Sequence, residues 1–284
     1  MPERAPDKPD WRPPVSIDPT RPCSGRVYAA WLGNADGGKD TFAVDRELAA
    51  KIAARSPQTP TSARNNRAFL ARAVTEIVQV QGVTQIIDIG AGLPTRQNTH
   101  QVAQAIDPTT RVVYVDNDPR IIVHARALLA DQGTPTGVTQ ADLRDPEAIL
   151  ADPELRDLID LTKPVGLLLV AIAHFLHNDA DPHYAYHIVD RLVAALPPGS
   201  FVALSHLTAE GVGEEVAREA VEMWKEANPD DYPVTRTREE IGRFLHDLKL
   251  LEPGVVPVDQ WRPATPHAKP MKKFWLYAAV AKKT

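Results

Sequence analysis

The sequence has one cysteine, no long hydrophobic run and no basic cluster, and each absence excludes a class of protein. Cys23 has no partner for an intramolecular disulfide, and a cysteine-rich zinc site cannot form. No apolar stretch approaches the roughly 20 residues of a membrane-spanning helix. Lys and Arg never occur more than two in a row, and the formal net charge is −5. Nucleic acid is therefore not an expected partner, because tight binding to phosphates needs a basic surface.

Composition divides the chain into three segments. Residues 1–24 are polar and rich in proline, which predicts an extended arm with little packed structure. This arm also lacks the apolar core of a signal peptide, so we expect a soluble cytoplasmic protein. Residues 25–80 carry apolar side chains at helical spacing and are interpreted as a helical cover, or lid. Residues 81–284 alternate strand and helix patterns and are interpreted as the core domain.

A buried strand that runs into a glycine turn is the strongest local signal. Three isoleucines lie just before Gly90 and Gly92, but the third glycine of a dinucleotide-binding turn is absent, because Thr95 stands there. Asp88 would repel a pyrophosphate at this turn and attract a cation. S-adenosylmethionine carries an ammonium and a sulfonium and no phosphate, so it is the cofactor whose charge fits. Alternatively, Asp88 caps its own turn.

The strand pattern predicts the fold. After the strand that ends near Ile89, further strands are expected over 111–116, 137–142, 165–172, 201–205, 250–258 and 274–281. Helical patterns separate most of them, which favours an α/β protein with a doubly wound, mostly parallel seven-stranded sheet. In such a sheet a ligand lies at the carboxyl ends of the strands, where the strand order reverses.

Two carboxylates at strand ends are candidates for contacts with the nucleoside of the cofactor. Asp116, with Asn117 beside it, is placed to accept hydrogen bonds from a ribose diol. Asp142 would meet the adenine amino group while Leu143 packs on the ring. Each has a structural alternative, since Asp116 could cap the next helix and Asp142 could be a solvated loop residue.

Two histidines follow apolar strands and are candidates for the general base. His174 and His206 would each face the acceptor from a strand end, or each could merely hydrogen-bond beneath it. No metal site is expected, although several other potential ligands follow the fourth strand: His177, His183, His187, Asp179 and Asp181. His174 is tied to the strand end, whereas His183 and His187 are four residues apart on a predicted helix.

Several of these segments together resemble a known family. The stretches at 88–95, 112–119, 141–146, 168–175 and 204–206 look like a bacterial family of S-adenosylmethionine-dependent methyltransferases that was formerly filed as a domain of unknown function. The likeness runs from about Gly25 to the C-terminus. It implies the Rossmann-like class I fold and S-adenosyl-L-methionine as the cofactor, and it leaves the methyl acceptor open.

The remaining expected site residues come from the turn and the cover. Ala91 lies between the two glycines of the cofactor turn, and Arg67 is expected on the cofactor side of the cover. Tyr28 and Trp31 are expected to face the substrate.

Three functions are compatible with these residues. The first is a methyltransferase that acts on an oxygen or nitrogen atom of a small molecule. A noncatalytic S-adenosylmethionine-binding sensor or partner protein is the alternative, since fold does not determine function. A nicotinamide oxidoreductase is disfavoured by Asp88 and by the missing third glycine. The motif of enzymes that methylate exocyclic base amines is also absent, because Ala173-His-Phe-Leu-His177 follows the fourth strand. The oligomeric state is not predicted.

Overall fold

The structure, a computed structural model, describes residues 19–33, 41–94, 97–129, 133–178, 181–265 and 269–284. Most of the proline-rich arm lies outside the described residues, as do Thr95, Asp179 and the loop at 34–40.

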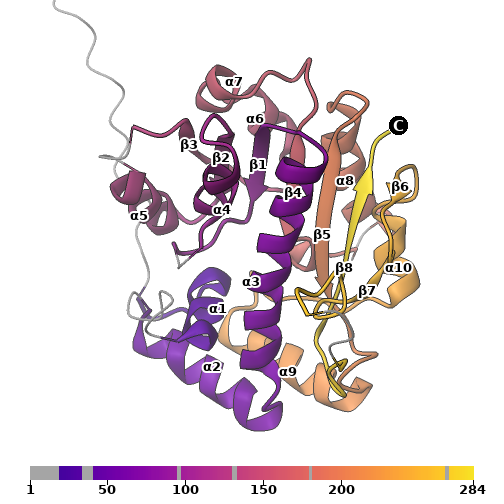
Figure 1. Ribbon diagram of the computed structural model, residues 1–284. Coiled ribbons are helices and arrows are strands. Elements are labelled where there is room, and N and C mark those ends of the chain that lie inside the picture. The colour runs from indigo at the N-terminus through magenta and orange to yellow at the C-terminus, as the bar shows by residue number, and fades with distance from the viewer. Residues whose placement is uncertain (1–18, 34–40, 95–96, 130–132, 179–180, 266–268) are drawn as a thin grey trace, which may run out of the picture.

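The centre of the molecule is a mixed sheet whose first five strands are parallel (Figure 1). Its strands are β1 (Gln85–Ile89), β2 (Arg111–Asp116), β3 (Thr136–Gln140), β4 (Gly166–Val170), β5 (Phe201–Leu207), β6 (Lys249–Leu250), β7 (Val256–Pro257) and β8 (Leu276–Lys282). The order is β3-β2-β1-β4-β5-β8-β6, and β7 also pairs with β8. Strand β8 runs antiparallel to its neighbour β5, and the two strands pair along their whole length. The predicted fold class is therefore confirmed.

The predicted strand over 250–258 needs a correction, because two strands of two residues each replace it. Pro253 and Gly254 turn the chain between β6 and β7, and Gly254 has a φ of +81°. The amide of Gly254 donates to the carbonyl oxygen of Leu251 at 2.8 Å, which closes the turn. The sheet therefore has eight strands in the described residues, where the sequence predicts seven.

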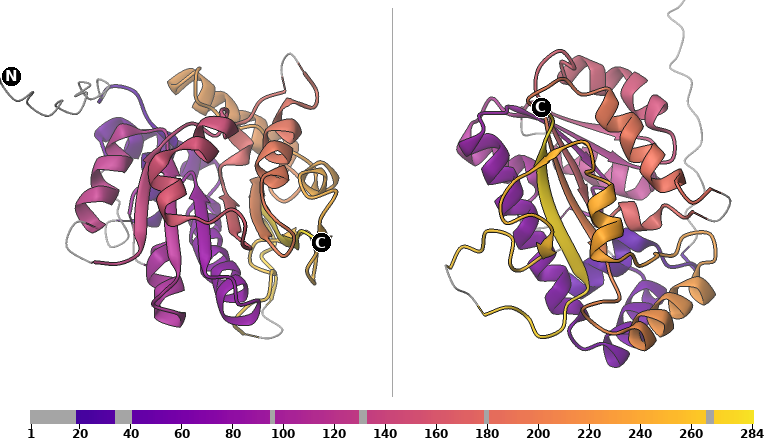
Figure 2. Two further views of the ribbon diagram at one scale, coloured as in Figure 1. Left: turned by 90° about the horizontal axis from the view of Figure 1, so that it is seen from above. Right: turned by 90° about the vertical axis from the view of Figure 1, so that its right-hand side faces the viewer.

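Helices cover both faces of the sheet (Figure 2). They are α1 (Ser24–Leu32), α2 (Ala43–Arg55), α3 (Thr59–Thr75), η3 (Glu76–Val80), α4 (Thr99–Ile106), α5 (Pro119–Leu129), α6 (Pro146–Ala151), α7 (Pro153–Leu158), η4 (Ala173–Phe175), α8 (Tyr184–Ala194), α9 (Glu214–Ala227) and α10 (Arg238–Arg243). Helices α3, α4 and α5 pack on one face, and α6, α7, α8 and α10 pack on the other.

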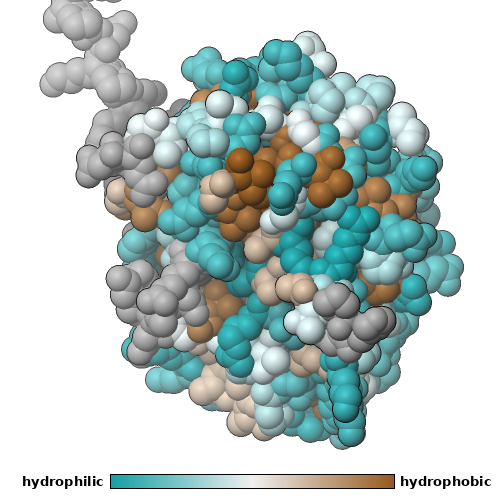
Figure 3. Space-filling model, viewed as in Figure 1, coloured by the Kyte–Doolittle hydropathy of each residue, from teal (hydrophilic) through white to brown (hydrophobic). Residues whose placement is uncertain are grey.

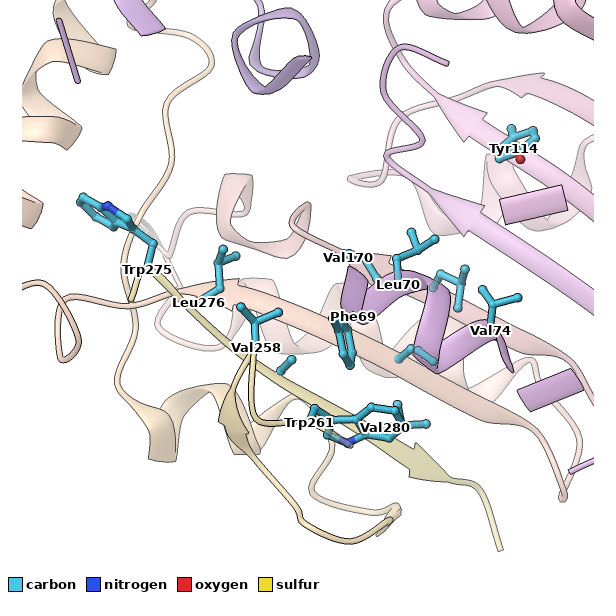
Figure 4. Close-up of a cluster of buried hydrophobic side chains, with 14 of the residues drawn as sticks. Phe69, Leu70, Val74, Tyr114, Val170, Val258, Trp261, Trp275, Leu276 and Val280 are labelled. Atoms are coloured by element: carbon cyan, nitrogen blue, oxygen red, sulfur yellow. The ribbon is translucent and has the colours of Figure 1, made fainter. Parts of the chain in front are cut away.

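Strands β1, β2, β4 and β5 each contribute to two hydrophobic cores, because neighbouring residues point to opposite faces. Ile86 belongs to the core under α3, whereas Ile87 belongs to the core under α8. In the first core, the ring of Phe69 on α3 meets Trp261 edge to face, with ring centroids 5.4 Å apart (Figure 4). The outer surface on the α3 side is mainly hydrophilic (Figure 3). Among the described residues, no helix combines the length and apolar character needed to cross a membrane.

Helices α1, α2 and α9 lie together at the carboxyl end of the parallel strands (Figure 1). A buried guanidinium joins this group to the sheet. Arg26 on α1 donates to the Asp45 carboxylate of α2 at 2.8 Å and to Asp118, just after β2, at 3.2 Å. The cover therefore contains a helix from the C-terminal half of the chain, which its predicted extent of 25–80 does not include.

Candidate cofactor and acceptor site

Two adjoining cavities open where the strand order reverses, between β1 and β4. The larger cavity, of about 170 Å³, lies beneath the cover. The smaller cavity, of about 50 Å³, lies beside the end of β3. Gly90, Asp116, Asn117 and Phe175 line both cavities, so a single ligand can extend from one into the other.

The glycine turn after β1 requires glycine for two different reasons. Gly90 has a φ of +75°, and a Cβ atom built on it would lie 2.5 Å from Cγ1 of Ile172. Gly92 has a φ of +67°, but a Cβ atom there would have no protein atom within 4 Å. Because Gly92 also lines the larger cavity, its missing side chain leaves space for a ligand.

Asp116 ends β2 at the border of the two cavities. Its Oδ2 accepts from the amide of Gly92 at 3.0 Å, and its Oδ1 accepts from the amide of Asp118 at 3.0 Å. An ionised carboxylate has about four acceptor positions, so two remain for a ribose diol. Burial raises the pKa of Asp116 to about 6, against the lowering effect of these amides. The side chain that caps α5 is that of Asp118, whose Oδ1 accepts from the amide of Arg120 at 2.9 Å.

Asp88 and Arg67 lie on the same side of the larger cavity. Thr99 donates to Oδ2 of Asp88 at 2.6 Å. Burial raises the pKa of Asp88, while this hydrogen bond and the charge of Arg67 lower it. Arg67 also donates to the carbonyl oxygen of Gln97 at 3.1 Å, which holds it close to the glycine turn. An amino acid carries both charges on one carbon, and this pair offers a partner for each.

The smaller cavity contains the residues expected around adenine. Leu143, Asn117 and Asp142 all line it. Asp142 already accepts hydrogen bonds from the amide, Nε and Nη2 of Arg144 and from Nδ2 of Asn117. Although burial raises its pKa, these bonds dominate and lower the pKa of Asp142 to about 2. Its acceptor positions are thus filled, so a contact with the adenine amino group requires Asn117 or Arg144 to give way.

His174 lies on η4, directly after β4, and lines the larger cavity. Its ring is 5% exposed, and Nδ1 has no hydrogen-bond partner among the described residues. Burial and the nearby charge of Arg236 lower the pKa of His174 to about 3. The imidazole is therefore neutral, and its Nδ1 is buried in the wall of the cavity without a hydrogen bond to the described residues.

His206, the other candidate for the base, lies away from both cavities. His206 is 0% exposed and is not among the described residues that line either cavity. Nδ1 lies 2.8 Å from the carbonyl oxygen of Leu207, and Nε2 lies 2.7 Å from Nη1 of Arg236. Both ring nitrogens are thus engaged by the protein. Arg236 is a contact that the sequence did not indicate.

The substrate-facing side chains predicted on α1 lie on the lining of the larger cavity, and further aromatic residues join them. The Tyr28 hydroxyl donates to the carbonyl oxygen of Ala63 at 2.8 Å. Trp31 meets Trp224 of α9 edge to face, with ring centroids 6.3 Å apart. We call the part of the cavity lined by Trp31, Ile52, Leu70, Val221, Trp224 and Leu276 the acceptor chamber. Trp224 was missed by sequence reasoning, although it belongs to the apolar stripe of α9.

Of the described histidines and acids after β4, His183 and His187 lie beside Asp181, but they do not form a metal-binding group. Within the described ranges, no group of three or more His, Cys, Asp or Glu side chains could hold a metal ion. His177 instead approaches the carbonyl oxygen of Tyr232 at 2.7 Å.

The sheet order, the glycine turn and the acidic strand ends define a doubly wound protein with a nucleoside-binding site at its switch point. The chain matches the family described as S-adenosyl methyltransferase over residues 10–284, and it belongs to that family. It is an S-adenosylmethionine-dependent methyltransferase, and S-adenosyl-L-methionine is its cofactor.

Two solved structures are similar over nearly their whole length. One is a DUF574 family protein from Streptomyces avermitilis, with 39% identity, a TM-score of 0.84 and coverage of 93% of this chain and 98% of that one. The other, from Thermobifida fusca, is provisionally described as a methyltransferase, with 38% identity, a TM-score of 0.85 and coverage of 93% and 96%. A search of curated proteins found no match. The resemblance predicted from the sequence motifs is confirmed.

Proposed function

We propose that this methyltransferase acts on an oxygen or nitrogen atom of a small molecule that enters the acceptor chamber. The observation that carries the proposal is the position of this chamber, beneath α1, α2 and α9 and continuous with the glycine turn. An acceptor there is surrounded by protein, so the site suits a small molecule better than a nucleic-acid strand. The negative net charge is consistent with this preference.

The residues around the glycine turn fit the cofactor. Gly90, Ala91 and Gly92 would carry it, and Asp116 would accept hydrogen bonds from its ribose. Asp88 and Arg67 would pair with its ammonium and carboxylate. Asn117, Asp142 and Leu143 would surround its adenine. When bound, the cofactor supplies an electrophilic methyl group, which the acceptor takes while the carbon–sulfur electron pair stays on sulfur.

His174 is assigned a positioning hydrogen bond to the acceptor. A base whose conjugate acid has a pKa of about 3 takes up a proton poorly at neutral pH, so general-base catalysis would contribute little. Orientation of the acceptor's nucleophilic atom can supply much of the acceleration instead. The proton released from the acceptor would then leave to water. His206 supports this arrangement from behind, since its ring meets His174 edge to face with centroids 5.6 Å apart.

The helical cover of residues 25–80 is assigned the role of a lid on the core of 81–284, and it closes against α9 of that core. Gly25 on α1 lies against the cofactor turn, since a Cβ atom built on it would be 3.5 Å from Cα of Gly92. Hydrogen exchange of α1 and α2 should therefore slow when the cofactor binds. Equal exchange in both states would contradict a lid.

Two measurements test the proposed function. Isothermal titration should detect binding of S-adenosylmethionine and S-adenosylhomocysteine to the protein and no binding of NAD. The protein is then incubated with methyl-labelled cofactor and with the separated small-molecule, protein and nucleic-acid fractions of a bacterial extract. Label should enter the small-molecule fraction, and Asp116→Asn should serve as the weakly binding control. Label in the nucleic-acid or protein fraction would refute the small-molecule acceptor.

A further inference from the structure

The aromatic side chains around the acceptor chamber present ring surface to it. The indole nitrogen of Trp31 donates to the carbonyl oxygen of Ala49 at 3.0 Å. That of Trp275, also on the cavity lining, donates to Oγ of Ser56 at 2.9 Å. Both polar atoms of these rings are used by the protein, so a ligand meets their hydrocarbon. Aromatic rings add about 0.5–1.5 kcal/mol per contact when they meet edge to face or offset.

The cavity lining contains few charged side chains, and none of them belongs to the set that defines the acceptor chamber. Among its described lining residues, those that carry charge are Arg67, Asp88, Asp116 and Asp231. Asp88 and Asp116 belong to the cofactor end through β1 and β2, and Arg67 is held there by Gln97. Asp231 is hydrogen-bonded to Ser24, and both also line the smaller cavity. A charged acceptor would therefore lose its hydration in the chamber without an opposite charge beside it.

Two buried polar atoms on the cavity lining lack partners among the described residues. They are Nδ1 of His174 and Oγ of Ser62, which is 1% exposed on α3. An unsatisfied buried polar atom costs about 1–3 kcal/mol, and a ligand that bonds it removes this cost. Both atoms are buried in the wall of a mainly apolar cavity, so a ligand can satisfy either one only once its side chain turns toward the cavity.

On the basis of the proposed function, we infer that the methyl acceptor is an uncharged aromatic molecule. Its ring system packs between α1 and α9 against Trp31 and Trp224, and its nucleophilic hydroxyl or ring nitrogen hydrogen-bonds to His174. Phenols and neutral azoles share this chemistry, and they differ in the atom that is methylated.

The test is a titration of the protein saturated with S-adenosylhomocysteine. The probes are 2-naphthol and 1H-indazole as the phenol and azole forms, with 2-naphthoate, 2-naphthylmethylammonium and decahydro-2-naphthol as matched charged and aliphatic compounds. The neutral aromatic probes should bind at least about tenfold more tightly than the charged ones, because an unpaired buried charge costs several kcal/mol. They should also exceed the aliphatic alcohol by about threefold or more, the equivalent of one aromatic contact. Equal affinities, or a preference for a charged probe, would overturn the inference.

Two variants and a control variant show whether the probes bind in the acceptor chamber. Val221→Lys, at a partly buried position on α9, should bring 2-naphthoate to at least the affinity of 2-naphthol. Trp224→Leu should weaken 2-naphthol about threefold or more, while Phe274→Leu, an aromatic position that is not among the described lining residues, should leave it unchanged. If Val221→Lys leaves the preference of the probes unaltered, they bind elsewhere and the inference is wrong.

Failure of this inference and failure of the proposed function give different results. Binding of S-adenosylhomocysteine is measured first in each sample. Protein that binds it but shows no preference among the probes refutes the aromatic acceptor alone. Folded protein that binds neither S-adenosylmethionine nor its product refutes the cofactor site, on which both proposals depend.

Discussion

The buried carboxylate of Asp116 makes cofactor binding depend on pH in a way that can be calculated. The ionised form accepts from the amides of Gly92 and Asp118 and keeps two acceptor positions for the ribose. A protonated carboxyl loses acceptor capacity and presents a hydrogen where a ribose hydroxyl should donate. With a pKa of about 6 in the free protein, about one molecule in eleven is ionised at pH 5, against about ten in eleven at pH 7. The dissociation constant should therefore rise about tenfold as the pH falls from 7 to 5.

The assay is isothermal titration with S-adenosylhomocysteine at pH 5, 6 and 7, with Asp116→Asn measured in parallel. The variant should bind at least severalfold more weakly at pH 7, because a buried ribose hydroxyl without its acceptor costs about 1–3 kcal/mol. It should also lack the tenfold change, so that any pH dependence it retains belongs to other groups. A parent dissociation constant that changes less than twofold, or an Asp116→Asn variant with unchanged affinity, would remove this carboxylate from the ribose site.

The same carboxylate affects folding in the opposite sense. Its pKa in the folded protein lies above the value of 3.8 for an unperturbed Asp, so the folded state binds this proton more tightly. Its contribution to the free energy of unfolding therefore increases as pH falls from about 6 to about 4. The difference of about two units corresponds to a cost of about 3 kcal/mol at pH 7 in the ligand-free protein. When urea unfolding is measured across this pH range, the free energies of unfolding of the parent and of Asp116→Asn should converge at low pH.

Three further predictions concern stability and turnover. Arg26→Met should lower the free energy of unfolding by about 3–5 kcal/mol, because Asp45 is 0% exposed and loses its charged partner. Arg55→Met, which breaks an exposed pair with Glu219, should lower it far less in the same urea titration. Equal losses would show that burial of the pair is irrelevant. Gly90→Ala should destabilise the ligand-free protein more than Gly92→Ala, because only its Cβ atom meets protein, while Gly92→Ala should mainly weaken cofactor binding in titration. The reverse ranking would show that Gly90 does not contact the protein, and Gly92 does not face the ligand, as described. His174→Gln should raise KM for the acceptor more than it lowers turnover, and the parent should show no break in its rate profile between pH 5 and 8 from this ring. A fall in turnover by about two orders of magnitude, with KM unchanged, would instead support a proton-accepting role.

Local patterns carried enough information to predict the sheet and the cofactor turn. Runs of β-branched residues marked the parallel strands, and Gly90 and Gly92 marked the turn, because both signals depend on neighbours in sequence. A similar local signal was available but overlooked at Pro253-Gly254, which separates β6 from β7. Arg144, two residues after Asp142, was another, since it fills acceptor positions on that carboxylate.

Contacts between distant segments could not be predicted in this way. Trp224 meets Trp31 across 193 positions of sequence, and nothing in α9 alone indicates that its apolar stripe packs on the cover. His174 and His206 looked equivalent because both follow apolar strands. Contacts from distant segments separate them, since Arg236 takes up Nε2 of His206, whereas Nδ1 of His174 has no partner among the described residues.

The two halves of the site come from different parts of the chain. Cofactor contacts are assigned mainly to one continuous stretch, from Asp88 to Leu143, whereas the acceptor chamber is built from segments that flank it on both sides, such as α1 and α9. Mutations accumulating in those flanks can redesign which molecule is methylated while the cofactor affinity is inherited unaltered. Changes in these helices can therefore alter acceptor specificity within the family while the cofactor-binding site stays the same. A chimaera in which α9 is exchanged between relatives is a direct way to transfer acceptor preference.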